Sequence, residues 1–411
     1  MSKKIRSHVT DLIEVIILQC IFLAGFSGKA DDTAWLSVPG LLVIVLETAL
    51  TVYGIRKNQE LGFPVLTAGS LLVLGIALQT YYGGAAPVRY TVLLAGGCVT
   101  AFFCARFVKA GMLTDGSAGD EKICRIYRKL PDLHGYLCIL LFFLSAADLA
   151  GAPLFNSVGA IEIGGFLLYP GEILVVLFVL HAACFVRNLD GTEKGIIHGF
   201  SRYIAASLMG ALALNMAGDT GNSFTVIILL FILSILVSTK KIGCMDRWLG
   251  LQGCVWAAGM FIVILLRQND GKAEAFGTVY SGITDCAGTF IALCGRAGAY
   301  ILMIVAVCLA LCVRRIPNTS RALCVLGIQG AVALYLQSVF HIGGNLGLVP
   351  TYGISMPFVS SDITGMLCSF ILLGGVIAAV QSKQENAGPL TENSVAENAE
   401  EIPGTDMNQE C

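Results

Sequence analysis

Charged side chains are scarce in this chain. They make up 13% of its 411 residues, whereas hydrophobic residues make up 56% and the mean hydropathy is +0.77. This composition excludes an ordinary soluble domain, in which about 25% of residues are charged. Paired Cys-x-x-Cys motifs are missing too, so the common zinc motifs are excluded. The fifteen cysteines lie mostly inside apolar runs, where cysteine serves as a small hydrophobic residue.

Long apolar runs account for most of the sequence. Runs such as 223–239 and 299–313 carry no charge and are about as long as a membrane crossing requires. The first run contains Asp11 and Glu14 and lacks a small-residue cleavage site, so we do not interpret it as a cleavable signal peptide. The sequence predicts an all-α polytopic membrane protein with about twelve spans, at 9–27, 34–54, 62–83, 87–108, 135–152, 169–187, 196–216, 223–239, 246–267, 297–313, 322–341 and 361–382.

The basic residues are distributed unevenly between the predicted loops. With Met1 in the cytoplasm, twenty-one of the 26 lysines and arginines fall on the inner side, among them the basic stretch KICRIYRKL in an inner loop at 109–134. The outer side keeps five, which are Lys29, Arg89, Arg267, Lys272 and Arg296. This bias follows the positive-inside rule, so we expect both termini to be cytoplasmic.

The stretch Gln337–Thr364 combines apolar character with residues that interrupt helices. Six glycines or prolines fall within fifteen residues, Pro350 and Pro357 among them. A continuous membrane helix does not tolerate this composition, because proline removes a backbone donor and glycine weakens the helix. Non-helical backbone at membrane depth persists only where protein or water satisfies its amides. We therefore predict an ordered lid or re-entrant loop, buried against neighbouring helices.

This stretch resembles the closing signature of the SEDS family (FtsW, RodA and SpoVE). The signature runs as N-I-G, G-x-x-P, G-x-x-x-P and a serine-led polar cluster. His341 stands at the asparagine, and we interpret it as a hydrogen-bonding residue. Asp362 and Thr364 stand where relatives have small glycine and serine, and Ser360 and Asp362 become candidates for binding substrate. The matching residues here are Ile342-Gly343, Gly347-Leu348-Val349-Pro350, Gly353-Ile354-Ser355-Met356-Pro357 and Ser360.

Two further blocks resemble the same family. Residues 159–166 and Tyr169-Pro170-Gly171-Glu172 are similar to G-A-x-R-W-I-x-L-G and Q-P-S-E, after which relatives carry a lysine. The Arg-Trp pair is missing here, and Val175 stands where the lysine would be. Pro-Gly-Glu at a helix start is ordinary capping, and beside the matched blocks Glu172 is also a substrate-binding candidate. Asp219 lies where relatives carry Q-P-D-L-G-T and is another, although Asp-Thr-Gly is a common turn.

The outer loop between the ninth and tenth predicted spans decides the catalytic assignment. Relatives end this loop with H-T-D-F-I-F, whose aspartate is the catalytic residue, and with E-E-L-G shortly after. Alignment on Thr284-Asp285 makes Asp285 the catalytic base, whereas alignment on Gly298 puts Ala287 at that place. The Glu-Glu pair is absent in both alignments. A solvated loop carboxylate is the alternative interpretation of Asp285.

The resemblance implies a ten-helix SEDS-like core over residues 62–383. Residues 1–61 then form an added pair of transmembrane helices. Residues 384–411 carry acidic side chains and no lysine or arginine, which is typical of a disordered tail, here expected in the cytoplasm.

The function implied by the resemblance is peptidoglycan synthesis at the bacterial plasma membrane. The reaction is glycosyl transfer between lipid II-type substrates, beside a class B penicillin-binding protein as partner. A divalent metal, or a basic residue such as Arg296 or Lys272, then stabilises the leaving pyrophosphate, and the sequence identifies no metal ligands. We expect no nucleic-acid partner. A non-catalytic scaffold or regulator and a lipid flippase or transporter are the alternatives, although no duplicated halves support transport.

Overall fold

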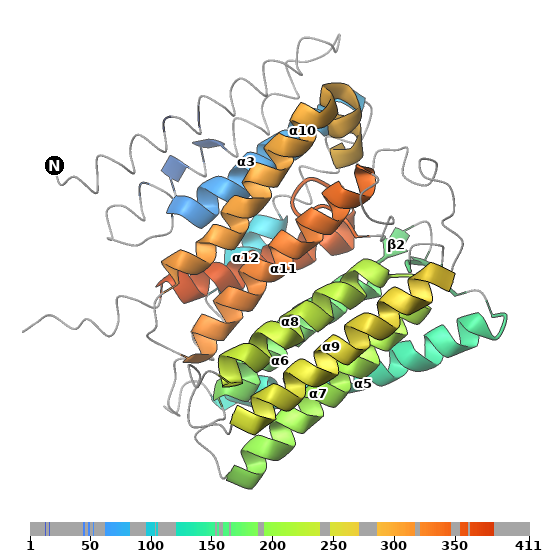
Figure 1. Cartoon of the computed structure of the whole chain (residues 1–411). Coiled ribbons are helices and arrows are strands. Elements are labelled where there is room, and N and C mark those ends of the chain that lie inside the picture. Colours follow the sequence, from blue (N-terminus) through green and yellow to red (C-terminus); the bar gives the residue numbers. More distant parts are fainter. Residues whose placement is uncertain are drawn as a thin grey trace, which may run out of the picture.

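The computed structural model describes a bundle of long helices (Figure 1). The described residues are 62–82, 96–102, 104–105, 121–152, 154–155, 159–163, 166–187, 193–238, 247–270, 286–316, 321–346, 354–360 and 362–381, with a few single positions before residue 53. The α-helices with defined bounds are α3 (Gly62–Tyr82), α5 (Glu121–Leu149), α6 (Pro170–Arg187), α7 (Glu193–Met216), α8 (Thr220–Ser238), α9 (Arg247–Asp270), α10 (Cys286–Leu311), α11 (Arg321–Asn345) and α12 (Ile363–Gln381).

Most of these bounds lie within a few residues of the predicted spans, and the all-α polytopic fold class is confirmed. Two boundaries were predicted wrongly. Residues 121–134, assigned to an inner loop, form the first half of α5, and the helix continues through Pro131. Residues 286–296, assigned to an outer loop, form the start of α10. Residues 121–134 carry six charged side chains, which hides the start of α5 from hydropathy, whereas 286–296 is apolar and is separated from the next apolar run only by Arg296.

The helices form two groups (Figure 1). Helices α5 to α9 lie side by side, and α3, α10, α11 and α12 make up the other group. Helix α6 is central, since it contacts α5, α7 and α8 in its own group and α11 and α12 in the other. The two groups therefore meet where α6 and α8 face α11 and α12.

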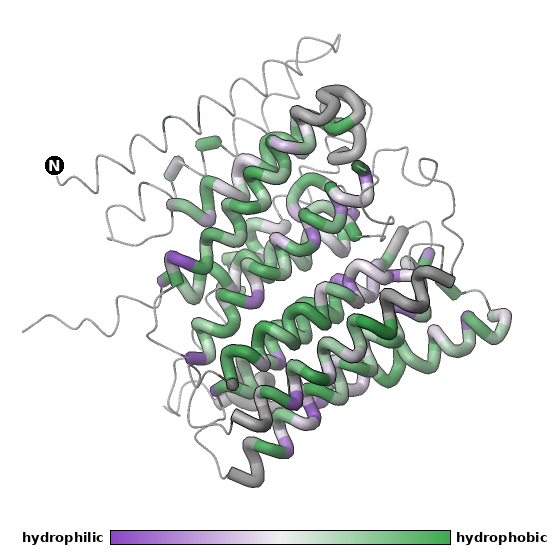
Figure 2. The backbone as a smooth tube through the Cα atoms, viewed as in Figure 1, coloured by the Kyte–Doolittle hydropathy of each residue, from purple (hydrophilic) through white to green (hydrophobic). Residues whose placement is uncertain are grey.

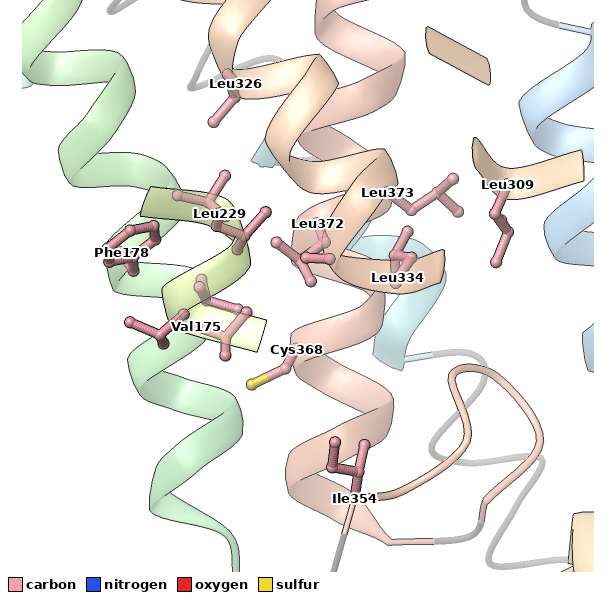
Figure 3. Packing of buried hydrophobic residues seen from close by; sticks show 14 of the residues in the cluster. Val175, Phe178, Leu229, Leu309, Leu326, Leu334, Ile354, Cys368, Leu372 and Leu373 are labelled. Carbon is pink, nitrogen blue, oxygen red and sulfur yellow. The ribbon is translucent and has the colours of Figure 1, made fainter. Parts of the chain in front are cut away.

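The apolar core lies along this junction (Figure 3). Val175 and Phe178 of α6 lie beside Leu229 of α8, and Leu372 of α12 faces them from the other group. All four side chains are buried. Close packing of this kind fixes how the two groups sit against each other, because protein interiors leave few voids.

The helices are apolar along much of their length (Figure 2). Tyr136 and Phe143 of α5 and Trp256 of α9 are large side chains that stay exposed, as expected for surfaces that face lipid. The first two predicted spans and most of the fourth lie outside the described residues. Among those described, five helical stretches are long and apolar enough to cross a membrane, which makes this a multi-pass membrane protein: Lys129–Leu149, Pro170–Arg187, Thr220–Val237, Arg321–Asn345 and Ile363–Gln381.

A small antiparallel hairpin precedes α6. Its strands are β1 (Ile161–Ile163) and β2 (Phe166–Leu168), with Ile161 opposite Leu168 and Ile163 opposite Phe166. The two intervening residues are glycines, which two-residue hairpin turns favour. The Tyr169 amide, directly after β2, donates to the Thr364 hydroxyl of α12 across 3.5 Å. The hairpin thereby connects to the same end of the bundle at which α6 and α12 begin.

Candidate functional site

Helices α6, α8 and α12 begin close together, and each carries a buried carboxylate at its start. Asp219 precedes α8 by one residue and Asp362 precedes α12 by one residue, while Glu172 lies in the first turn of α6. Acidic side chains are stabilised at these positions because the first backbone amides of a helix point outward and carry partial positive charge. The fold thus gathers three of the predicted substrate-binding candidates at one site.

Asp219 is fully occupied as the cap of α8. Its Oδ1 accepts from the Asn222 amide at 3.1 Å, and its Oδ2 accepts from the Asn222 side-chain amide at 3.0 Å. The oxygen of that Asn222 side chain accepts in turn from Gln337 of α11, at 3.5 Å. Burial raises the pKa of Asp219 to about 7, although both bonds from Asn222 act in the opposite direction.

Two glycines make room for Asp219. Gly159 has a φ of +72°, and a Cβ added there would lie 2.6 Å from the Asp219 Cβ. A Cβ added at Gly171 would lie 1.9 Å from the Asp219 Oδ2. Because Gly159 and Gly171 have no side chain, their backbone can pack directly against Asp219 at the start of α8.

Glu172 reaches from α6 to the segment before α12. Its Oε1 accepts from the Ser355 amide at 3.3 Å and from the Ser355 hydroxyl in a short contact. Its Oε2 is buried and has no hydrogen-bond partner. The side chain as a whole is 1% exposed.

Asp362 shows the same division between its two oxygens. Its Oδ1 accepts from the Gly365 amide at 2.5 Å, which caps α12. Its Oδ2 is buried and has no partner. A Cβ added at Gly365 would lie 2.0 Å from the Ser355 hydroxyl, 2.6 Å from the Asp362 Oδ2 and 2.7 Å from the Glu172 Oε2. The two unpartnered oxygens therefore converge on one point beside Gly365.

Ser360 shapes the segment that covers this site. Its hydroxyl accepts from the Met356 amide at 2.8 Å, and we find it turned to its own segment. Residues 354–360 are buried except for Ser355, as predicted for this part of the loop, while 350–353 lie outside the described residues. Phe358 has a φ of 64°, rare for an aromatic residue, and its ring packs edge-on against Phe370.

His341 makes the hydrogen bond that its position predicted. Its Nδ1 donates to the Ile354 carbonyl at 2.7 Å, which ties the end of α11 to the covering segment. Val175, at the place of the family's lysine, is fully buried in the apolar core beside α8 (Figure 3). This position therefore supplies no positive charge to the site.

Asp285 lies outside the described residues. Helix α10 begins at the next residue, Cys286, so Ala287, the other candidate for the catalytic place, belongs to the first turn of that helix. Arg296 lies on α10 and Lys272 outside the described residues. Whether Asp285 joins the three carboxylates stays a prediction.

Sequence reasoning missed the partners of these carboxylates. Ser355 was quoted only as part of a motif, and Asn222 was not singled out, although its spacing of three from Asp219 is typical of a helix cap. It also missed a buried pair in which the Nδ1 atoms of His134 on α5 and His181 on α6 lie 2.9 Å apart. Nothing in the sequence pairs these histidines, which are 47 residues apart.

In the part of the chain that the structure describes, no three side chains form a ready-made metal site. No group of three histidine, cysteine, aspartate or glutamate residues there is placed to hold an ion. The available donors are the free oxygens of Glu172 and Asp362 beside the Ser355 hydroxyl. Oxygen donors suit hard cations such as magnesium, which commonly uses one or two carboxylates and takes its other ligands from water or phosphate.

The sequence matches no known protein-family model and no curated protein. Its structure is similar to the rod shape determining protein RodA of Thermus thermophilus, with a TM-score of 0.50 and 18% identity over 80% of this chain and 98% of that one. An aspartate-to-alanine mutant of that RodA and a chain from a peptidoglycan synthase complex each have a TM-score of 0.49 and 16% sequence identity, over 80% of this chain and 99% of theirs. The chain therefore has the RodA fold, the polytopic helical fold of the SEDS proteins.

Proposed function

We propose that this protein acts in bacterial cell-wall synthesis, as a SEDS-type glycosyltransferase that polymerises lipid-linked disaccharide-peptides at the outer face of the plasma membrane. The observation that supports this best is the meeting of three separate sequence blocks at one buried site. Glu172, Asp219 and Asp362 come from segments far apart in the sequence, and each lies in a block that resembles the SEDS pattern. The RodA fold supports the same conclusion.

In this proposal Asp285 takes the proton from the acceptor sugar hydroxyl as it attacks the anomeric carbon of the donor. Proton abstraction of this kind typically contributes about 10²–10⁴-fold to a rate. Glu172 lies in the site to which the substrate binds, and Asp219 and Ser360 hold α8 and the covering segment in position. A divalent cation held by Glu172 and Asp362 fits their free oxygens, and when bound it would neutralise charge on the departing pyrophosphate.

A non-catalytic scaffold is the second candidate, and Val175 favours it. The lysine expected at this position is replaced by a side chain buried in the core, so one basic group of the family pattern is absent from the site. The missing Glu-Glu pair after Asp285 points the same way. A scaffold of this kind would keep the fold and the surface for its partner without the chemistry.

The decisive experiment is polymerisation of lipid II by the purified protein, with and without a class B penicillin-binding protein. Asp285→Asn removes the base and keeps the size of the side chain, so polymer yield should fall by at least 10²-fold while the amount of folded protein stays the same. Asp132→Asn is the matched control, because Asp132 is a partly exposed carboxylate on α5 that pairs with Arg202.

Each outcome selects between the two candidates. Equal polymer from wild type and Asp285→Asn would remove Asp285 from the proposed mechanism. No polymer from wild type, with a partner that is active in a parallel reaction, would contradict the enzyme and support the scaffold.

A further inference from the structure

Two buried carboxylate oxygens at the starts of α6 and α12 have no hydrogen-bond partner. They are the Oε2 of Glu172, on a residue 1% exposed, and the Oδ2 of Asp362, on a residue 8% exposed. An unpaired carboxylate oxygen away from water costs free energy, since its desolvation is not repaid. Both oxygens lie beside the same Gly365 position, so one ligand can satisfy them together.

Neighbouring donors are already committed. The Ser355 hydroxyl carries a single proton, and it contacts the other oxygen of Glu172. The Gly365 amide is used by the other oxygen of Asp362. Among the described residues, no lysine or arginine pairs with either carboxylate, and the side chains that act on Asp362 are the Ser355 hydroxyl and His341. The described residues around these oxygens therefore supply two carboxylates and no lysine or arginine to match them.

We propose that Glu172 and Asp362 bind a divalent cation of the magnesium class between the starts of α6 and α12. Such cations commonly take one or two carboxylates from protein, which leaves positions for water and for phosphate oxygens. The Ser355 hydroxyl oxygen lies at the same point and is a third oxygen donor.

The site belongs to this chain's own pattern. Asp362 stands where the SEDS signature has a small residue, and the lysine three positions after Glu172 is replaced by buried Val175. One carboxylate is gained and one ammonium is lost, so a bound cation takes over the positive charge. Its use for a pyrophosphate-bearing substrate rests on the proposed function, whereas cation binding by the two carboxylates does not.

Manganese binding to the full-length protein in detergent tests the site without any substrate. Electron paramagnetic resonance measures free Mn²⁺, which should fall as one ion binds per protein and rise again when Mg²⁺ competes. Glu172→Gln and Asp362→Asn each remove one charged ligand and keep the size of the side chain, and each should weaken binding at least tenfold. Asp132→Asn, which also removes one carboxylate, should bind as wild type does.

Thermal unfolding provides a second readout and controls for folding. Mn²⁺ should raise the melting temperature of wild type and Asp132→Asn, because a ligand that binds the folded state stabilises it. Mn²⁺ should not raise the melting temperature of Glu172→Gln or Asp362→Asn. Cooperative melting of these two variants without Mn²⁺ shows that they fold.

The cation site would be overturned if wild type showed no saturable Mn²⁺ binding, which would point to a proton shared by the two carboxylates instead. It would also be overturned if Glu172→Gln and Asp362→Asn bound Mn²⁺ as tightly as wild type, or if Asp132→Asn weakened binding as much as they do. The proposed function fails separately. A protein that binds Mn²⁺ as described and makes no polymer would contradict the glycosyltransferase and leave the cation site intact.

Discussion

Two aspartates cap helices in the same way and differ in what their second oxygen does. Asp219 and Asp362 each accept one bond from the amide three residues ahead. The Asn222 side chain donates to the second oxygen of Asp219, whereas the second oxygen of Asp362 has no hydrogen-bond partner. Asp219 therefore has the environment of a structural residue, and Asp362 has that of a ligand.

The raised pKa of Asp219 predicts a pH-dependent stability. The folded protein holds this proton up to about pH 7, whereas an unfolded aspartate loses it near 3.8. The stability that protonated Asp219 contributes to the folded state is fully present below pH 3.8. It is lost as the pH rises towards 7, at up to about 1.4 kcal/mol per pH unit. Asp219→Asn cannot titrate, so its melting temperature should fall less than that of wild type between pH 4.5 and 7.5. Parallel curves would show that Asp219 does not hold a proton in the folded state.

Gly365 tests how tightly the free oxygens converge. An added Cβ would meet the Ser355 hydroxyl at 2.0 Å and both free oxygens below 3 Å, so Gly365→Ala should destabilise the protein by about 1–3 kcal/mol. Gly259→Ala on α9 is the control, because nothing lies within 4 Å of its added Cβ. We expect thermal unfolding to show a lower melting temperature for the first variant only. Similar melting of both variants would mean that the site is open enough for a methyl group.

At the scale of elements, residues 354–360 behave as part of the core although they join two helices. The Val359 and Ser360 amides donate to the Met356 carbonyl, and the Met356 amide donates to the Ser360 hydroxyl. These bonds form within the segment, and Glu172 of α6 and His341 of α11 add hydrogen bonds to it at Ser355 and Ile354. This is how non-helical backbone is satisfied when water is excluded.

The covering segment should resist amide hydrogen exchange as strongly as the ends of the adjoining helices. Ser360→Ala leaves the Met356 amide without its acceptor at a cost of about 1–3 kcal/mol, so exchange over 354–360 should accelerate. Ser234→Ala is the matched control, because the buried Ser234 hydroxyl donates only to the Leu230 carbonyl within α8. Unchanged protection in Ser360→Ala would mean that this bond does not hold the segment closed.

At the scale of the whole molecule, the starts of α6, α8 and α12 lie at one end of the bundle. The contacts of Gly171 with Asp219 and of Glu172 with Ser355 join these starts directly. The predicted topology puts all three on the outer side, since each follows a loop that is poor in lysine and arginine. The structure thus brings together segments that the charge bias assigned to the same side.

Reporter fusions test the orientation of that end. A reporter after Lys383 should be active in the cytoplasm, and one inserted within Gly271–Ser281 should be active outside, because the basic residues favour the inner side. Fusions in the 188–192 connection, predicted to be inner, serve as the control. An external C-terminus would contradict the even number of spans and with it the assignment of every loop.

The sequence by itself predicted the spans that the described helices match, because hydropathy reports directly on the bilayer, whereas the sidedness that the basic residues favour stays a prediction. It also determined the candidates Glu172, Asp219 and Asp362, since their blocks keep a recognisable order. It did not show where α5 and α10 begin, because 121–134 is rich in charged side chains and Arg296 interrupts the apolar sequence at the end of 286–296.

Only the tertiary structure decided what each candidate does. Whether a carboxylate oxygen is capped or free depends on partners such as Asn222 and Ser355, and the Glu172–Ser355 contact spans 183 residues of sequence. The convergence beside Gly365 depends on how α6 and α12 pack, which is fixed by shape complementarity in the core. Residue order carries no record of that geometry, and so the paired free oxygens appear only in the fold.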